Sequence, residues 1–205
     1  TINKSSLHMN TKLYTGNGNA NHAITGVGFA PDFVWSKRRD GTNAHVLVDR
    51  VRGATKVLYS SLTNAQATQT DSLSSFTSDG FQLGIDGKVN GNNQKIVGWT
   101  WNAGSSTVTN NDGNIASQVR ANQTNGVSIV TWTGTGSAQT VGHGLGAKPK
   151  FIIAKNISNT GMWPVYHSSY GATKYTYLNN MIEAKSYQHF WNNTEPTTSV
   201  FTVGN

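Results

Sequence analysis

The chain has 205 residues, a formal net charge of +7, and charged residues at only 12% of its positions. The length allows one large domain or two small ones, each with a modest core. Disordered chains lack aromatic residues, whereas this chain contains 6 Trp, 7 Tyr and 7 Phe, so the composition excludes a disordered chain. Its 22 Gly and its many Thr residues favour strands and turns over helices.

The same numbers disfavour several functional classes. The absence of Cys excludes disulfides and thiolate chemistry. No apolar run approaches the roughly 18 residues that a membrane span requires. The basic residues are scattered apart from Lys37–Arg39, so nucleic-acid binding, which needs basic residues gathered on one face, is not predicted. The positive charge instead favours weak affinity for anionic surfaces such as charged polysaccharide.

Short strands separated by polar turns are expected in the first half of the chain. No stretch has a sustained 3.6-residue apolar period, which argues against long helices. Residues 62–75 are expected to be a polar loop, and Val97, Trp99 and Trp101 share one face of a closing strand. The expected strands are Lys12–Thr15, His22–Thr25, Phe33–Lys37, His45–Val48, Lys56–Ser60 and Lys95–Trp101, with a tight hairpin over Phe76–Leu83.

The second half is expected to follow after a linker at residues 104–114, which are rich in Ser, Thr, Asn and Gly. One short helical turn is predicted at Met181–Lys185. The whole pattern predicts an all-β fold of two tandem β-sandwich-like (jelly-roll-like) units, residues 1–103 and 115–205. The strands expected in this half are Ile115–Arg120, Val127–Trp132, Phe151–Lys155, Trp163–His167, Tyr175–Leu178 and Val200–Val203.

An internal repeat relates the two halves. Thr15–Lys37 aligns without a gap on Thr133–Lys155, 118 residues later, and nine of the 23 positions are identical. Unrelated segments of ordinary composition would share roughly one or two. The repeat is about as long as one domain, so we expect a tandem duplication. The identical pairs are Thr15/Thr133, Gly16/Gly134, Gly18/Gly136, Ala20/Ala138, Gly26/Gly144, Gly28/Gly146, Pro31/Pro149, Phe33/Phe151 and Lys37/Lys155. Further matches are Gly53–Lys56 with Gly171–Lys174, and Phe81–Gly84 with Phe201–Gly204 at an offset two residues longer.

The second copy is incomplete, because nothing after Gly204 matches the closing strand Lys95–Trp101. We expect either that the closing strand lies beyond residue 205 or that the second sheet ends in an open edge. An open edge promotes association unless something covers it. We therefore expect the N-terminal lead-in, residues 1–10, or a neighbouring subunit to cover that edge.

Catalytic and metal-binding motifs are not found in the sequence. Gly142–Gly146 beside Lys148 lacks the Gly-Lys-Ser/Thr and the following helix of a phosphate loop, so we interpret it as a turn. The six His residues show no metal-ligand spacing, and no Gly-x-Ser-x-Gly motif is present. The second copy keeps almost none of the acidic residues that a paired-carboxylate glycosidase needs. We predict no enzymatic activity, no cofactor and no metal.

Aromatic residues are the candidates for ligand binding, because exposed rings form platforms on which sugars stack. Tyr187 and Trp191 lie in a polar context and are predicted to be the more exposed pair. Trp163 and Tyr166 are further candidates, although alternation within their strand favours a core position.

Several blocks of the sequence together resemble a known module. They are Tyr14–Gly18, Gly28–Lys37, Val51–Lys56, Ser78–Gly84, Val141–Lys155, Trp163–His167 and Trp191–Thr194. In this order they resemble a repeated β-rich module of tailed-phage virion proteins, seen especially in phages of marine and freshwater bacteria, including cyanophages. The resemblance implies a virion structural role, in a tail fibre, a tail appendage or a capsid-surface decoration. It brings no catalytic site that can be transferred to this chain.

The combined prediction is a non-enzymatic phage virion structural protein exposed on the particle. It would assemble with other virion proteins, as a homo-oligomer, and contact host surface polysaccharide. One alternative is a carbohydrate-binding module with aromatic platforms. Another is a polysaccharide-cleaving, tailspike-type enzyme whose acidic residues come partly from neighbouring subunits.

Overall fold

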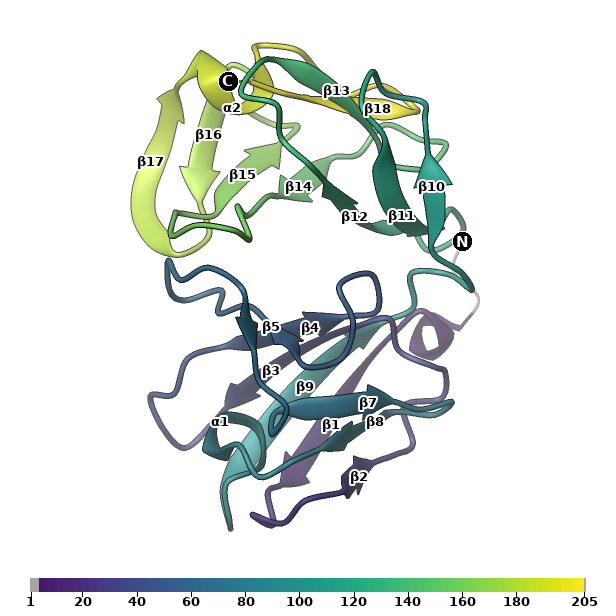
Figure 1. The fold of residues 1–205 in the computed structure, drawn as a ribbon, viewed down its shortest axis with the longest axis vertical. Helices are drawn as coiled ribbons and strands as arrows, with labels where there is room; N and C mark the ends of the chain where they lie inside the picture. Colours follow the sequence, from purple (N-terminus) through teal and green to yellow (C-terminus); the bar gives the residue numbers. More distant parts are fainter. Residues whose placement is uncertain (1–3, 205) are drawn as a thin grey trace. The chain divides into compact units, whose positions relative to one another are not determined.

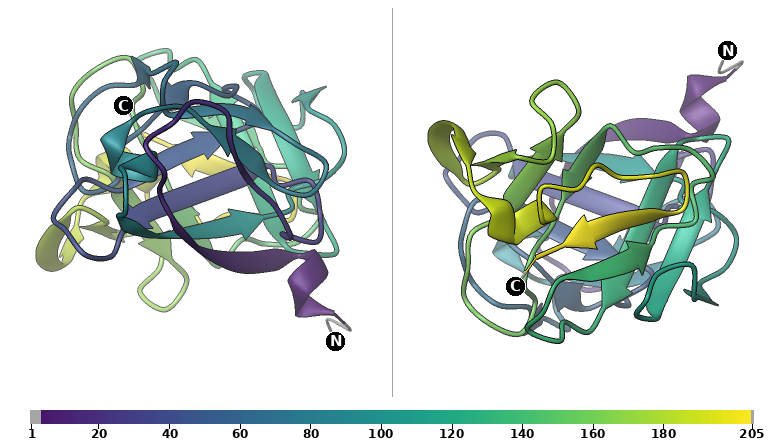
Figure 2. Two further views of the ribbon diagram at one scale, coloured as in Figure 1. Left: turned by 90° about the horizontal axis from the view of Figure 1, so that it is seen from below. Right: turned by 90° about the horizontal axis from the view of Figure 1, so that it is seen from above.

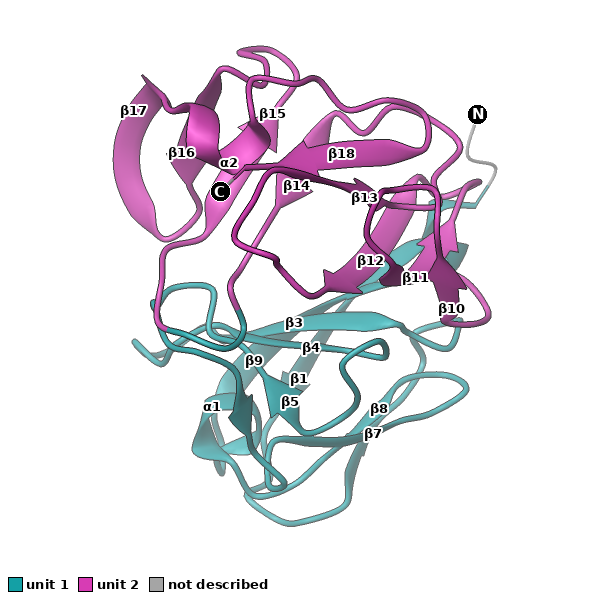
Figure 3. Ribbon diagram, turned by 45° about the horizontal axis from the view of Figure 1, so that its top comes forward, with its two compact units in different colours: residues 1–103, 157–159 teal, residues 104–156, 160–205 magenta. Residues whose placement is uncertain are grey.

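The computed structural model describes residues 4–204, and the fold is all-β, as the sequence predicts. The strands form several antiparallel sheets, and α1 (Gly87–Asn90) and α2 (Gln188–Trp191) are single turns. The chain divides into two compact units, coloured separately in Figure 3. Unit 1 comprises residues 1–103 and 157–159, and unit 2 comprises residues 104–156 and 160–205. Within residues 4–204, no helix is both long and apolar enough to span a membrane.

Unit 1 begins with a 3-10 turn, η1, and contains nine strands within its described residues. A four-stranded sheet has the order β1-β9-β3-β4, a three-stranded sheet has the order β2-β8-β7, and β5 pairs with β6. The elements are η1 (Ser5–Leu7), β1 (Met9–Thr15), β2 (His22–Ile24), β3 (Phe33–Arg38), β4 (Val46–Asp49), β5 (Lys56–Val57), β6 (Ala67–Thr68), β7 (Leu73–Phe76), β8 (Phe81–Leu83), α1 and β9 (Lys95–Trp101).

The core of unit 1 lies between its two larger sheets. Val34 and Val48 from the four-stranded sheet pack with Leu73 and Phe81 from the three-stranded sheet, and all four are almost completely buried. Figure 1 shows β7 and β8 lying along one face of the larger sheet, and Figure 2 shows the layers from below. Side chains alternate between the two faces of a strand, so other residues of the four-stranded sheet lie on the face away from this core. Trp35 and Trp99 lie on that face, with ring centroids 6.3 Å apart.

Within its described residues, unit 2 contains three sheets. Their orders are β10-β11-β12, β13-β18 and β14-β15-β16-β17. Its core groups Tyr166, Ala172 and Trp191, with Ile152 packed against them. The strands are β10 (Val108–Asn110), β11 (Ser117–Asn122), β12 (Val127–Trp132), β13 (Gln139–Gly142), β14 (Phe151–Ile153), β15 (Pro164–His167), β16 (Lys174–Tyr177), β17 (Asn180–Ser186) and β18 (Val200–Val203).

Strand registers in the two units follow the 118-residue offset of the sequence repeat. Three pairs of residues that face each other across strands in unit 1 have counterparts in unit 2. In each case, adding 118 to both residue numbers gives the pair in unit 2. A register is sensitive to a shift of one residue, because such a shift turns every side chain to the opposite face. The matched pairs are Phe33↔Asp49 with Phe151↔His167, Lys56↔Thr68 with Lys174↔Ser186, and Leu47↔Leu58 with Val165↔Thr176.

The glycines of the repeat explain why part of the sequence identity is kept. Four glycine pairs at the 118-residue offset have positive φ in both units: Gly18/Gly136, Gly26/Gly144, Gly28/Gly146 and Gly53/Gly171. Residues with a Cβ rarely adopt this conformation, so the same backbone turn requires the same residue. The matched registers and turns support the duplication, which stays a hypothesis about ancestry.

One pair of matched positions differs in chemistry. In unit 1 the buried side chains of Asp49 and Arg52 form an ion pair with an Nε–Oδ2 distance of 2.5 Å. In unit 2 the corresponding residues are His167 and Tyr170, whose ring centroids are 5.6 Å apart. An aromatic contact in unit 2 therefore replaces the ion pair of unit 1. Unit 2 keeps the turn although it lacks the acidic residue.

Several predicted elements need correction. Residues 104–114 are not a free linker, because they contain β10 and belong to unit 2. Their polar side chains form local hydrogen bonds instead, such as Asn110 Oδ1 accepting from the N–H of Asp112 at 2.9 Å. Met181–Lys185 lies within strand β17 and is not helical, because it pairs with β16 as a hairpin. The expected polar loop at 62–75 contains β6 and the start of β7.

The described part of the N-terminal lead-in belongs to unit 1, where the carbonyl of His8 accepts from the N–H of Asn102 at 2.9 Å. Strand β1 then pairs with β9 from Met9 to Thr15. The expectation that the lead-in covers the edge of unit 2 is therefore wrong for residues 4–10. The expectations of a strand beyond residue 205 or of a neighbouring subunit stay predictions.

Two glycines should be intolerant of any side chain. A Cβ on Gly84 would lie 2.4 Å from the carbonyl oxygen of Asp71, and a Cβ on Gly204 would lie 2.1 Å from that of His189. We expect Gly84→Ala to lower the free energy of unfolding by about 2–4 kcal/mol, since the backbone must move. Gly134→Ala is the control, because nothing lies within 4 Å of its Cβ position, and its effect should stay within about 0.5 kcal/mol. Equal urea midpoints for the two variants would contradict the proposed packing.

Candidate functional site

Three of the four aromatic residues predicted from the sequence to bind a ligand lie in the core. Tyr166 is completely buried, and Trp191 and Trp163 are exposed by only 2% and 4%. Tyr166 and Trp191 contact each other edge to face, with ring centroids 6.0 Å apart. Their ring faces are covered by protein and are not available for a sugar to stack on, so these three assignments are wrong. Trp191 is buried because the short helix α2 turns it inward, where the sequence suggested an exposed loop. For Trp163 and Tyr166 the core position is the one that their strand pattern favoured.

Tyr187, the fourth candidate, is 46% exposed and belongs to a group of aromatic side chains. Its ring centroid lies 5.8 Å from Tyr175, 5.2 Å from Phe190 and 4.8 Å from His189. Tyr177 completes the group, 5.0 Å from Tyr175 and 6.0 Å from Phe190. We call these five residues the tyrosine cluster.

Two adjacent elements bring the cluster together. Tyr175 and Tyr177 alternate along β16, so both side chains project from the same face of the strand. Tyr187 is the residue preceding α2, and the single turn of that helix places Phe190 against Tyr175 at 4.7 Å. The alternation Lys-Tyr-Thr-Tyr at 174–177 was a signal in the sequence that could have identified the two strand residues. The contact with α2 had no such signal.

The packing of the cluster fixes its rings and leaves one of them accessible. Most of the ring pairs meet at interplanar angles between 61° and 81°, the edge-to-face geometry that aromatic pairs favour. The other four members are partly buried, so Tyr187 presents the most exposed ring. A rigid exposed ring loses little conformational entropy when a ligand stacks on it.

The hydroxyl groups of the cluster can act as neutral hydrogen-bonding groups. Burial, together with the hydrogen bond and charge of neighbouring Tyr175, raises the pKa of Tyr177 to about 12. Tyr177 therefore keeps its proton at neutral pH and can both donate and accept. Lys185 on β17 is exposed and pairs across the strands with Tyr175, so it lies beside the cluster. The site thus combines an apolar ring face, neutral hydroxyls and positive charge.

The acidic residues are engaged elsewhere in local structure. Seven of the nine accept hydrogen bonds from backbone N–H groups or from other side chains. Asp79, for example, accepts from the N–H groups of Gly26 and Gly28, and these bonds hold the pKa of its carboxyl below the usual value. The seven are Asp32, Asp40, Asp49, Asp79, Asp86, Asp112 and Glu195. Among residues 4–204, no group of three or more His, Asp or Glu side chains could hold a metal ion.

Glu195 links the core under the cluster to the surface. Its carboxylate accepts from the Tyr166 hydroxyl at 2.6 Å and from the N–H of Ala172 at 2.7 Å, and it lies 3.0 Å from Lys148 Nζ. The Tyr166 hydrogen bond is the main cause that lowers the pKa of Glu195. The ionised carboxylate therefore stabilises the folded state, and that stabilisation is present above the ordinary pKa of 4.5 and is lost as pH falls below it.

We expect Glu195→Gln to lower the free energy of unfolding by about 1 kcal/mol at pH 7, a modest value because the carboxylate is partly solvated. The difference from wild type should shrink as pH falls below 4.5. Urea unfolding at pH 7, 5 and 3.5 would measure it. Glu183→Gln is the control, since Glu183 is an exposed carboxylate on β17. A constant difference across this pH range would show that the charge of Glu195 is not the cause.

Comparisons with known proteins give one match. The sequence model of the family described as Domain of unknown function (DUF7483) matches residues 4–205. No curated protein and no solved structure matches the chain significantly. The match covers both units and attaches no activity, ligand or partner to them.

Proposed function

We propose that the chain, which belongs to the DUF7483 family, is a non-enzymatic structural protein on the surface of a phage particle. We further propose that unit 2 adheres to acidic surface polysaccharide through the tyrosine cluster. In this proposal the chain sits in a tail fibre, a tail appendage or a capsid decoration. Its partners are other virion proteins and further copies of itself. The virion role is supported by the resemblance of the sequence blocks described above.

The observation that carries the adhesive role is the exposed ring of Tyr187, held by Tyr175 and Phe190. Sugars present C–H faces that stack on aromatic rings, and their hydroxyls form hydrogen bonds with neutral polar groups. The protein has 16 basic residues against 9 acidic residues, which favours an anionic polysaccharide over a neutral one. The engagement of seven acidic side chains in local structure supports binding without cleavage.

A carbohydrate-binding module outside any virion is the second candidate, and the same cluster favours it. The two candidates differ in where the protein is found. Immunogold labelling of purified particles, using antibody against this chain, should decorate them at a fixed position if the virion role is right. Unlabelled particles from the same lysate, with the chain recovered only in the soluble fraction, would favour the binding module.

Removing the exposed ring should weaken polysaccharide binding. We expect Tyr187→Ala to reduce affinity for an acidic bacterial polysaccharide about tenfold, the loss of one stacking contact worth about 1.4 kcal/mol. Binding would be measured on an array of acidic and neutral bacterial polysaccharides. Phe151→Ala is the matched control, because Phe151 is also an exposed aromatic residue of unit 2 and lies outside the cluster. Equal loss in the two variants, or no binding by the wild type, would contradict the proposal.

A further inference from the structure

The hairpin of β16 and β17 places one cation on the same face as the tyrosine cluster. Tyr175 pairs directly with Lys185 across the two strands. Residues that face each other in an antiparallel pair project from the same face of the sheet. Tyr175 also packs against the core of Tyr166 and Trp191. Lys185 therefore continues the core-facing side of the sheet out to its edge strand, β17, where the lysine is exposed (Figure 1).

Tyr187 lies on that face too. Its N–H donates to the carbonyl of Thr173 at 3.3 Å, so the pairing of Lys174 with Ser186 continues by one residue in the same register. The backbone of Tyr187 is extended. Alternate residues of an extended segment share a face, so Lys185 and Tyr187 project in the same direction. Two residues of a strand span about 7 Å, which sets the distance between the lysine and the exposed ring.

Lys185 is not neutralised within the described part of the chain. Among residues 4–204, its ammonium group forms no ion pair. Glu183, the acidic residue of the same strand, is not joined to it either. An exposed ammonium group without a carboxylate partner keeps its charge available for an anionic ligand.

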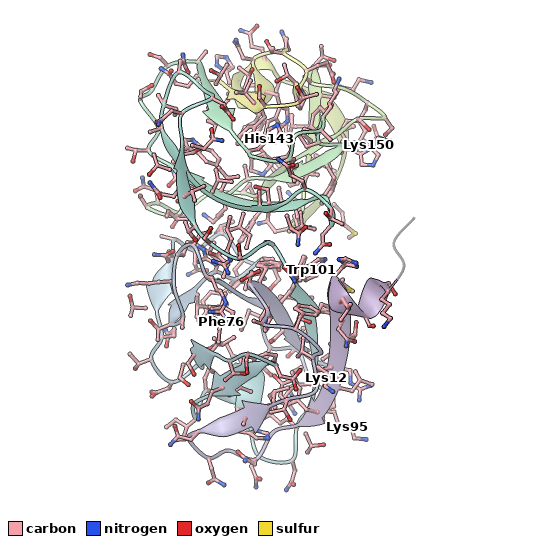
Figure 4. The ribbon with its side chains drawn as sticks, turned by 90° about the vertical axis from the view of Figure 1, so that its right-hand side faces the viewer. Lys12, Phe76, Lys95, Trp101, His143 and Lys150 are labelled. Atoms are coloured by element: carbon pink, nitrogen blue, oxygen red, sulfur yellow. The ribbon has the colours of Figure 1, made fainter. Side chains whose placement is uncertain are left out.

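The other exposed lysines of unit 2 do not share this position. Lys174 begins β16, and alternation along that strand places it on the face opposite the cluster. Lys148 is paired with a carboxylate at 3.0 Å. Lys150 precedes β14 and lies on the outside of the unit in Figure 4. Lys185 therefore combines exposure, free charge and the face of the cluster.

A ring and a cation at this spacing match the chemistry of an anionic sugar. The C–H face of a sugar stacks on the Tyr187 ring, and cluster hydroxyls remain for the hydroxyls of the sugar. The flexible four-carbon stem of Lys185 lets its ammonium group reach a negative group on the stacked sugar or on the next one. Lysine acts as a point charge, so a carboxylate and a sulfate ester are both suitable partners.

We propose that Lys185 selects anionic sugars at the tyrosine cluster, by contacting a carboxylate or sulfate group of the sugar that stacks on Tyr187 or of its neighbour. This inference rests on the proposed polysaccharide binding. It assigns the preference for acidic polymers to one residue in place of the net charge of the chain. A preference that came from net charge alone would respond equally to the loss of any exposed lysine.

Charge reversal at two positions of the hairpin separates these two causes. Lys185→Glu and Lys174→Glu change the net charge equally, and both lysines are exposed. The probes are polygalacturonate, which carries carboxylates, dextran sulfate, and uncharged dextran. Biolayer interferometry on the full chain would measure their binding. We expect Lys185→Glu to weaken binding of at least one anionic polymer about tenfold and to leave dextran binding unchanged. Lys174→Glu should weaken binding by less than about twofold.

Salt dependence gives a second measure of the same contact. Wild-type binding of the anionic polymer should weaken as NaCl rises from about 0.05 to 0.5 M, because salt screens an exposed charge pair. Lys185→Glu should remove most of this dependence, and Lys174→Glu should keep it. Lys185→Arg should bind as the wild type does, since it keeps the charge.

The outcomes distinguish this inference from the function on which it rests. Weakening confined to polygalacturonate identifies a carboxylate as the partner of Lys185, and weakening confined to dextran sulfate identifies a sulfate ester. Equal weakening by the two charge reversals would overturn the role of Lys185 and assign the preference to net charge. Unchanged affinity of Lys185→Glu beside a weakened Tyr187→Ala would also overturn it and leave polysaccharide binding intact. No binding of any polymer by the wild type would contradict the proposed function and this inference together.

Discussion

The pairing of β9 on both of its sides is the interaction on which the structure of unit 1 depends. Strand β9 joins β1, near the start of the chain, to β3, and so completes the sheet that covers the core of Val34, Val48 and Phe81. This pairing connects residues about ninety positions apart, as in Met9 with Trp101. Pairing strands that are far apart in the sequence costs conformational entropy, because a long loop must close. Such a pair is stable only when the sheet that it forms also buries an apolar face. Unit 2 keeps the hairpins around this place and has no such central strand among its described residues.

The two units keep the same turns and registers but differ in the side chains that line them. Unit 1 holds its turns with ion pairs, such as Asp49 with Arg52, whereas unit 2 has the rings of His167 and Tyr170 in these positions. Lys150 similarly replaces Asp32. Unit 2 has three acidic residues where unit 1 has six, and it contains more aromatic residues than unit 1. Exposed aromatic rings beside a basic side chain are suited to binding anionic glycans. The proposed function of unit 2 therefore rests on its aromatic residues.

Particular residues show which elements the sequence patterns predict correctly and which they do not. Apolar alternation located β3, β9, β12 and β15 to within a residue or two, because one face of each strand is buried or half-buried. It failed at Met181–Lys185, where an exposed edge strand has no apolar period and only pairing with β16 decides its conformation. It also failed at 104–114, since Asn, Ser and Thr form strand and turn hydrogen bonds as readily as they form linkers. For the site, a polar context identified Tyr187 but also suggested Trp191, which is buried.

The sequence by itself determined the all-β class, the 118-residue repeat and the glycine turns, because strand alternation and positive φ are local constraints on the chain. Only the tertiary structure decided which aromatic rings face solvent. Exposure depends on what packs above a residue, as α2 shows by burying Trp191 and leaving Tyr187 exposed. The position of β9 between β1 and β3 likewise depends on strand pairs whose members are far apart in the sequence of unit 1.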